Sequence, residues 1–241
     1  MRVEHLKAHS RSLGIAMLLA MAALGAAVPP AAGAGRKPVV VELFTSQGCS
    51  SCPPANANLA ALSDRPGIIA LSFGVTYWDR LGWKDTFGRK EYTARQATYE
   101  APLGEPGPFT PQIVIGGRAS LVGDELAAVE QLIARDAAQD YATAVTLGPR
   151  SVVVGGGPAP RDGADIWLVS YDPRSVEVPI RRGENGGRTL PHKNVVHDLA
   201  LLGRWNGTAL TLPLPAVPAG LRAAVLVQAS GGGPILAAAS N

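Results

Sequence analysis

The first half of the chain begins with the hydrophobic pattern of a parallel α/β unit. Residues 39–44 (Val-Val-Val-Glu-Leu-Phe) are apolar at all but one position and predict a buried strand. Ala55, Leu59 and Leu62 then recur at helical spacing, and residues 68–73 form a second apolar run. A strand, a helix and a strand in this order predict a βαβ unit, which requires a parallel sheet.

The pattern then changes and later resumes. Residues 76–105 are charged and aromatic, and they predict a helical insertion. Two apolar runs at 109–115 and 118–122 flank a Gly-Gly pair, which predicts an antiparallel hairpin. Apolar positions spaced along residues 126–137 predict a further helix.

The second half reads as an all-β region. Helical periodicity disappears after about residue 147, and turn signals separate short apolar runs. Three hairpins are predicted, with turns at residues 172–174, at Asn206-Gly207 and at the triple glycine 231–233. The expected fold is therefore an α/β domain over residues 35–147 followed by a small all-β, sandwich-like domain over residues 148–241.

Residues 1–34 have the features of a secretory signal peptide. Arg2, Lys7 and Arg11 precede an apolar run from Leu13 to Val28, and small residues follow it. The run is short for a bilayer span, which needs about 20 apolar residues, so we expect cleavage rather than anchoring. The expected location is periplasmic or secreted, with no stable membrane insertion after cleavage.

The charge balance argues against a nucleic-acid partner. The whole chain has 22 Lys+Arg and 19 Asp+Glu, and removing residues 1–34 leaves 19 and 18. A net charge of +1 does not supply the basic surface that phosphate backbones require.

The two cysteines, Cys49 and Cys52, carry the most specific chemistry. A closed zinc site needs four ligands, and the chain has no other cysteine. A structural disulfide remains an alternative, although so short a loop contributes only about 2 kcal/mol in the chain-entropy expression. Thiol–disulfide exchange fits better, because the pair is predicted where a strand passes into a helix N-terminus, and such sites lower cysteine pKa values. Cys49 is expected to be the exposed attacking thiol and Cys52 the resolving thiol.

Two further features are candidates for the same site. Thr110-Pro111 precedes a predicted strand, and a cis bond there would leave the Thr110 backbone free to pair with an extended substrate. An ordinary trans proline at an edge strand is the alternative. Glu42 lies in an apolar strand, so a buried carboxylate that accepts the Cys52 proton is one interpretation and a solvated strand-end glutamate is the other.

Together these residues resemble a thioredoxin-like domain. The resemblance covers roughly residues 37–145 and implies that Cys49 is the nucleophile, Cys52 the resolving thiol and Pro111 the cis-proline. Residues 42–54 are also similar to the signature of an exported bacterial family known as domain-of-unknown-function family 1223 (DUF1223). The similarity continues through four more segments, at residues 77–79, 81–85, 93–96 and 183–190.

The chain departs from that family pattern at three positions. Family members usually carry His and Asp where this chain has Gly74 and Thr76, and often an aspartate where it has Asn56. Two interpretations stay open, weaker proton transfer near the sulfurs or neutral change at surface positions.

The aromatic and histidine residues permit other interpretations. Trp78 and Trp83 either line a groove for an extended partner or, as we favour, form the core of the insertion. His192 and His197 would bind copper only if the cysteines lay close by. Because the two histidines are predicted in a polar loop, we expect them to be solvated.

The sequence thus predicts an exported thiol–disulfide oxidoreductase acting on protein or small-molecule thiols and disulfides, including extended polypeptides, without a cofactor. The alternatives are a non-catalytic binding module with a closed disulfide and a copper-handling protein.

Overall fold

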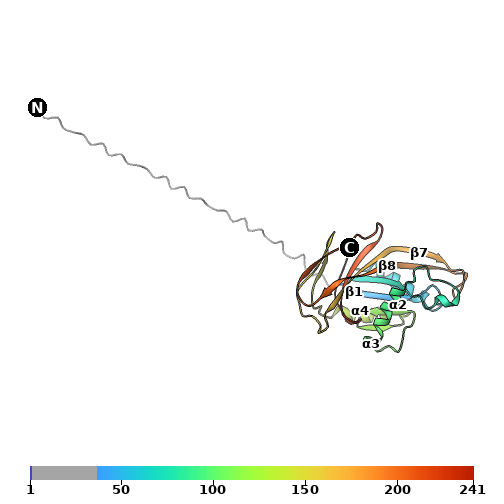
Figure 1. The fold of residues 1–241 in the computed structure, drawn as a ribbon. Helices are drawn as coiled ribbons and strands as arrows, with labels where there is room; N and C mark the ends of the chain where they lie inside the picture. Colours follow the sequence, from blue (N-terminus) through green and yellow to red (C-terminus); the bar gives the residue numbers. More distant parts are fainter. Residues whose placement is uncertain (2–36) are drawn as a thin grey trace. The chain divides into compact units, whose positions relative to one another are not determined.

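The computed structural model describes Met1 and residues 37–241 (Figure 1). Apart from Met1, the expected signal peptide lies outside the described residues. The helices are α1 (Pro53–Ser63), η1 (Asp79–Leu81, a 3-10 helix), α2 (Lys90–Thr98), α3 (Glu100–Leu103) and α4 (Leu126–Ala137). The strands are β1 (Val39–Thr45), β2 (Ile68–Gly74), β3 (Gln112–Ile115), β4 (Ala119–Leu121), β5 (Val145–Leu147), β6 (Ser151–Val154), β7 (Ala164–Pro179), β8 (Thr189–Trp205), β9 (Leu210–Pro213), β10 (Arg222–Ala229) and β11 (Ile235–Ser240). No helix within residues 37–241 has the length and apolar character that a bilayer span requires.

A large mixed sheet organises these elements, with strand order β11-β10-β7-β8-β2-β1-β3-β4. β1 and β2 are parallel and are connected through α1, which confirms the predicted βαβ unit. β3 and β4 form the predicted hairpin around Gly116 and Gly117, both of which have positive φ. Residues 76–105, the expected insertion, contain η1, α2 and α3, and the protein is a mixed α/β structure.

The strands of the expected second domain continue this same sheet. β8 lies parallel to β2, with Val195 opposite Ser72. At the junction, Asn194 has a φ of 52°, a left-handed conformation that asparagine tolerates better than most residues. Its Nδ2 donates to the Ala70 carbonyl oxygen at 2.8 Å, which joins β8 to β2 beside this pair. Residues 37–241 belong to one unit, which differs from the expectation of a domain boundary near residue 147.

Alternate residues of the strands pack on opposite faces of the sheet. On one face, Val39, Val41 and Leu43 contact α1 and α4. Farther along this face, the small sheet β5-β6-β9 packs against β7 and β10. The opposite face carries Phe44 and the insertion helices, whose largest buried side chain is Tyr92. The βαβ unit thus buries both of its faces, which explains why its strands are nearly continuous apolar runs.

The predicted turn at residues 172–174 is wrong, because β7 runs straight through it. The Asp172 carboxylate accepts bonds from the Arg174 amide and guanidinium, and the register to β8 shifts at this point. A local side-chain bond therefore supports a bulge rather than a reversal. β7 and β8 are the long paired strands in Figure 1, and the true hairpin tip is residues 180–188.

The other two hairpin predictions have different outcomes. The β10–β11 hairpin is confirmed, with its turn at the triple glycine. The chain does turn at Asn206-Gly207, but β9 pairs with β6 and not with β8. The second half is consequently divided between the large sheet and the small one.

Candidate functional site

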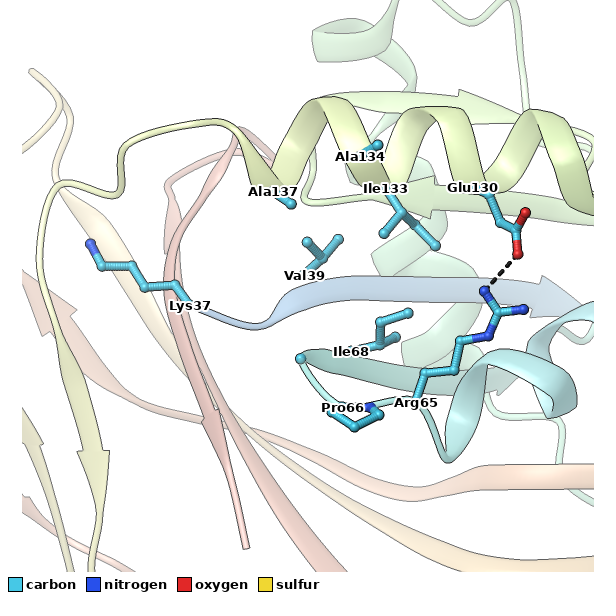
Figure 2. Close-up of a pocket in the computed structure, with 10 residues that line it drawn as sticks. Lys37, Val39, Arg65, Pro66, Ile68, Glu130, Ile133, Ala134 and Ala137 are labelled. Atoms are coloured by element: carbon cyan, nitrogen blue, oxygen red, sulfur yellow. Dashed lines mark hydrogen bonds and ion pairs between the residues drawn. The ribbon is translucent and has the colours of Figure 1, made fainter. Parts of the chain in front are cut away.

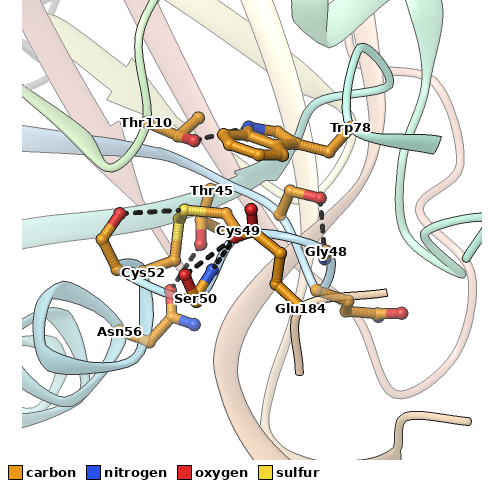
Figure 3. The surroundings of a disulfide bond; sticks show 12 residues. Thr45, Gly48, Cys49, Ser50, Cys52, Asn56, Trp78, Thr110 and Glu184 are labelled. Atoms are coloured by element: carbon orange, nitrogen blue, oxygen red, sulfur yellow. Dashed lines mark hydrogen bonds between the residues drawn. A yellow bond between two sulfur atoms is a disulfide. The ribbon is translucent and has the colours of Figure 1, made fainter. Parts of the chain in front are cut away.

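The cysteine pair lies where the chain passes from β1 to α1. Cys49 and Cys52 are joined in a disulfide (Figure 3). Cys52 is the N-cap residue of α1, and Pro53 follows in the first turn, where a missing N–H costs nothing. The Cys52 carbonyl oxygen accepts a hydrogen bond from the Asn56 backbone N–H at 3.1 Å. The predicted placement of the sulfurs at a strand–helix junction is therefore confirmed.

The prediction that Cys49 is exposed is wrong. Cys49 and Cys52 both have 0% of their surface exposed, although Ser50 and Ser51 between them are exposed. The only polar side-chain contact described for the Cys49 sulfur is with the Ser51 hydroxyl, 3.4 Å away. Any exchange reaction at Cys49 consequently requires a change in what covers it.

The hairpin tip, residues 180–188, is bonded to the cysteine loop. Asn185 is fully buried, and its Nδ2 donates to the carbonyl oxygens of Gln47 at 3.0 Å and Cys49 at 2.8 Å. Glu184 is exposed, and its Oε2 accepts bonds from the Ser50 amide at 3.0 Å and the Ser50 hydroxyl at 2.7 Å. The tip is therefore bonded to three residues of the cysteine loop, Gln47, Cys49 and Ser50.

These contacts affect the charge of the tip. The bonds from the Ser50 amide and hydroxyl lower the pKa of Glu184 below its ordinary value, so the carboxylate is charged at neutral pH. Arg188 Nη1 donates to Asn185 Oδ1 at 2.7 Å, which fixes the orientation of the amide. A negative charge next to Cys49 disfavours a second one, so the bound tip opposes formation of a Cys49 thiolate.

Thr110 and Trp78 lie on another side of the disulfide (Figure 3). The Thr110-Pro111 bond is cis, as predicted, and Pro111 is buried. β1 and β3 are antiparallel with Phe44 opposite Gln112, so the residues before Gln112 lie beside those that follow β1. Trp78 Nε1 donates to the Thr110 hydroxyl at 2.7 Å. Within residues 37–241 no hydrogen bond is described for the Thr110 backbone N–H or carbonyl.

Glu42 is buried, the first of its two interpretations, but its carboxylate is bonded to groups other than Cys52. Its Oε1 accepts Arg95 Nε at 2.6 Å, and its Oε2 accepts the Tyr99 hydroxyl. Glu42 alternates with the β1 residues that contact α1, so its side chain lies on the face covered by the insertion. Burial opposes the charge on Arg95, but the Glu42 carboxylate raises the pKa of the guanidinium above its usual value. Glu42 therefore belongs to a buried ion pair across the sheet from the cysteine helix.

A second polar cluster supports the loop between β1 and the cysteines. Asp85 accepts the Gln47 amide at 2.7 Å and the Phe87 amide at 2.8 Å. The Gln47 side chain accepts the Trp83 indole N–H at 2.9 Å and donates to Thr86 at 2.8 Å. Burial raises the pKa of Asp85 above its ordinary value. Trp83 and Trp78 are thus both fixed against the cysteine loop, rather than forming only the core of the insertion.

The three departures from the family pattern have structural contexts. A Cβ on Gly74 would lie 2.9 Å from the Phe87–Gly88 backbone, so this buried position has no room for a side chain. The Thr76 hydroxyl lies 3.1 Å from that of Thr93. Asn56 is nearly buried, and its Oδ1 accepts the Thr45 hydroxyl at 2.8 Å. Gly74 and Asn56 are therefore not the surface positions that neutral change would require.

His192 is not the solvated residue that the sequence predicts. The residue is 3% exposed, and its ring packs edge-on against Phe87 with centroids 5.5 Å apart. Burial lowers the pKa of His192 to about 4, so the ring is neutral at pH 7. Across residues 37–241, no three His, Cys, Asp or Glu side chains gather in a way that would hold a metal ion. The copper hypothesis therefore has no geometric support in this part of the chain.

Sequence reasoning missed the roles of Glu184 and Asn185. The 183–190 segment stood out as a motif, but its separation from Cys49 along the chain gave no sign that the two meet. The one signal in the sequence was the polar Gly-Glu-Asn-Gly-Gly run, whose Glu and Asn are not needed to form a turn.

Comparisons with known proteins agree with the motif similarity. The model of a family described as "Protein of unknown function (DUF1223)" matches residues 40–228. The crystal structure of protein AGR_C_4864 from Agrobacterium tumefaciens is 30% identical, with a TM-score of 0.69 over 84% of this chain and 92% of that one. HBP35 of Porphyromonas gingivalis is 15% identical, with a TM-score of 0.55 over 87% of this chain and 76% of that one, a likeness of fold alone. No curated protein matches. The chain therefore belongs to the DUF1223 family.

Proposed function

We propose that this protein is an exported thiol–disulfide oxidoreductase with a thioredoxin-like reaction centre at Cys49 and Cys52. The observation that carries the proposal is the position of the pair at the β1–α1 junction, beside Thr110 (Figure 3). Export rests on the signal-like pattern of residues 1–34. A disulfide at this position suits an oxidising compartment.

The reaction exchanges two electrons between the pair and a partner dithiol. A partner thiolate attacks Cys49 Sγ, forming a mixed disulfide and releasing Cys52 as a thiolate. A second partner thiolate then attacks the partner's sulfur in the mixed disulfide, and Cys49 leaves as a thiolate. The partner is oxidised, the Cys49–Cys52 pair is reduced, and the same steps in reverse reduce a partner disulfide.

The N-terminus of α1 supports the ionised form of the thiols. No side chain caps the helix at Cys52, so the positive end of the helix dipole faces the sulfur region. The Ser51 hydroxyl, 3.4 Å from Cys49 Sγ, is placed to donate to a thiolate. Both effects lower thiol pKa values. They act fully only when Glu184 moves away from Ser50, because its charge opposes them.

Thr110 offers a place for an extended partner segment. Its backbone N–H and carbonyl have no partner among the described residues, and it lies at the edge of the cysteine region. An extended chain satisfies such groups by pairing as a strand does. Trp78, bonded to the Thr110 hydroxyl, supplies an adjacent aromatic surface.

The proposal is tested by trapping exchange intermediates in the mature protein. Cys52→Ser is expected to accumulate mixed disulfides through Cys49, and Cys49→Ser, its matched control, is expected to accumulate none. Wild type titrated with a dithiol should show one reversible two-electron couple. If Cys52→Ser captures neither a partner protein nor a model thiol, the proposal is wrong.

Burial of both sulfurs favours a second candidate, a binding module whose disulfide stays closed. This candidate predicts that alkylation of freshly extracted protein labels neither cysteine. The oxidoreductase predicts that a fraction of Cys49 is labelled. The two functions are therefore separated by one mass measurement on protein quenched in acid.

A further inference from the structure

A pocket of about 340 Å³ lies between α2 and the β7–β8–β10 region of the sheet. Its lining includes Ala94, Arg95, Trp167, Leu199 and Gln228, and none of the cysteine-loop residues. This volume falls within the range of small-molecule sites. The pocket is thus a candidate binding site separate from the disulfide.

Another cavity of similar size, about 320 Å³, lies at the start of β1 (Figure 2). Its charged groups are already engaged. Arg65 pairs with Glu130 at 2.6 Å, and Lys37 donates to the Tyr141 carbonyl oxygen at 3.0 Å. This cavity shows no buried polar group with spare capacity, so the pocket beside α2 is the stronger candidate.

The floor of the α2 pocket has unused hydrogen-bonding capacity. Arg95 is 5% exposed; its Nε donates to Glu42 and its Nη2 to Tyr99. Gln228 is 2% exposed, and its Nε2 donates to Tyr99 and Gly233. Neither Arg95 Nη1 nor Gln228 Oε1 has a described hydrogen-bond partner in the protein. Neither belongs to the described polar atoms that are fully buried without a partner, so both retain contact with the surface. These two atoms are therefore open to a ligand in the pocket that both residues line.

The walls are apolar and the mouth is acidic. Trp167 and Leu199 provide the apolar surface, and the Arg95 guanidinium already lies 5.8 Å from the centre of the Trp167 ring. Glu91 and Asp165 also line the pocket, and Asp165 Oδ1 lies 3.6 Å from Nη1 of Arg204. Because Glu42 neutralises Arg95 and Arg204 offsets Asp165, Glu91 provides the charge that a ligand meets.

One end of the pocket is closed by the glycine turn between β10 and β11. A Cβ on Gly232 would lie 2.2 Å from the Thr98 carbonyl oxygen, so only glycine allows the turn to approach α2 this closely. The shape of the pocket is thus fixed by the fold, both at this end and at its floor.

We propose that this pocket binds a small aromatic amine that also carries a neutral carbonyl, such as an aromatic amino acid amide. The aromatic ring lies on Trp167 and Leu199, the carbonyl oxygen accepts from Arg95, and the protonated amine faces Glu91. An anionic ligand is disfavoured by the Glu91 carboxylate. The site is independent of the redox proposal, because it uses neither cysteine.

The test uses three probes of similar size on the oxidised full-length protein at pH 6.5, where an α-amine is largely protonated. Phenylalaninamide has all three features, N-acetylphenylalaninamide lacks the charge, and phenethylamine lacks the carbonyl. For a ligand of this size we expect a Kd of about 1 mM or tighter for phenylalaninamide by ligand-observed NMR. Each of the other two probes should bind about fivefold more weakly, the effect of one lost polar interaction.

Matched variants place the binding in the pocket. Ala94→Phe fills it from the exposed side of α2 and should abolish binding, whereas Ala97→Phe, exposed on the same helix but outside the lining, should leave it unchanged. Glu91→Gln should reduce the preference for phenylalaninamide over its acetylated form. No saturable binding up to about 10 mM, equal loss in both Phe variants, or equal affinity for the charged and acetylated probes would each overturn the proposal.

Discussion

Replacing Asn185 with alanine should uncover the disulfide. In the native structure the Asn185 amide donates to two carbonyl oxygens of the cysteine loop, those of Gln47 and Cys49. Alanine cannot donate, so both bonds are lost. The hairpin tip then remains attached to the loop mainly through the exposed contact between Glu184 and Ser50.

The size of the effect follows from the number of bonds. A typical intramolecular hydrogen bond contributes about 0.5–1.5 kcal/mol, so the two together hold the tip closed by about 1–3 kcal/mol. If a reductant reaches Cys49 only when the tip opens, the open population sets the rate. A change of 1.4 kcal/mol is tenfold, so reduction should be about 5- to 150-fold faster.

The assay is the rate of disulfide reduction by excess dithiothreitol, followed by alkylation and mass measurement. Asn206→Ala is the control, since Asn206 also makes a local bond, to Thr208 at 3.1 Å, but lies in an exposed turn. Its reduction rate should match wild type. A rate for Asn185→Ala within twofold of wild type would show that the hairpin tip does not control access to Cys49.

Three more predictions test the remaining contacts. The bonds from Ser50 lower the pKa of Glu184 in the folded state, so the contact is present above the ordinary glutamate pKa and lost as pH falls through the folded value. Reduction by a phosphine should therefore accelerate as the pH falls below the ordinary glutamate pKa. Glu184→Gln should remove this dependence, whereas Glu125→Gln should not. Arg95→Met leaves the Glu42 charge buried without its partner and should lower the free energy of unfolding by about 3–5 kcal/mol in urea titrations. Adding Glu42→Leu should restore most of this loss. If the losses of the two substitutions instead add, the unpaired charge is not the main cause of the destabilisation. Gly74→Ala places a Cβ 2.9 Å from the Phe87–Gly88 backbone and should cost about 1–3 kcal/mol, whereas Gly107→Ala, with nothing within 4 Å, should be neutral in the same titration.

The local elements of the fold were predictable because each follows from a short pattern. β1, α1 and β2 are encoded by apolar runs and by apolar residues at helical spacing, and each element buries those residues. The β2–β8 contact was not predictable, because Ser72 and Val195 meet across more than a hundred residues of chain. The turn predicted at Asp172-Pro173-Arg174 failed because the same residues that favour turns also stabilise a bulge within a long strand.

The candidate site divides in the same way. The strand–helix junction determines where the sulfurs lie, and it is local. The bond from Asn185 to the Cys49 carbonyl oxygen joins residues more than 130 positions apart, so no spacing argument around Cys49 could reveal it. Burial of Glu42 was one of two interpretations of the strand pattern, and its partner, Arg95, comes from the insertion on the other face of the sheet. A strand pattern indicates that a side chain is buried, but not which group neutralises it.

The contacts that hold the hairpin tip also suggest how a partner would gain access. The tip bonds to backbone groups of Gln47, Cys49 and Ser50, which are the groups that a partner strand would use. A partner that pairs with these groups and with the Thr110 backbone compensates for the bonds lost when the tip leaves. A small thiol offers no such compensation and must wait for spontaneous opening. If the proposed exchange chemistry is correct, protein partners should therefore react much faster than small thiols of equal reduction potential, and Asn185→Ala should narrow that difference by accelerating only the small thiols.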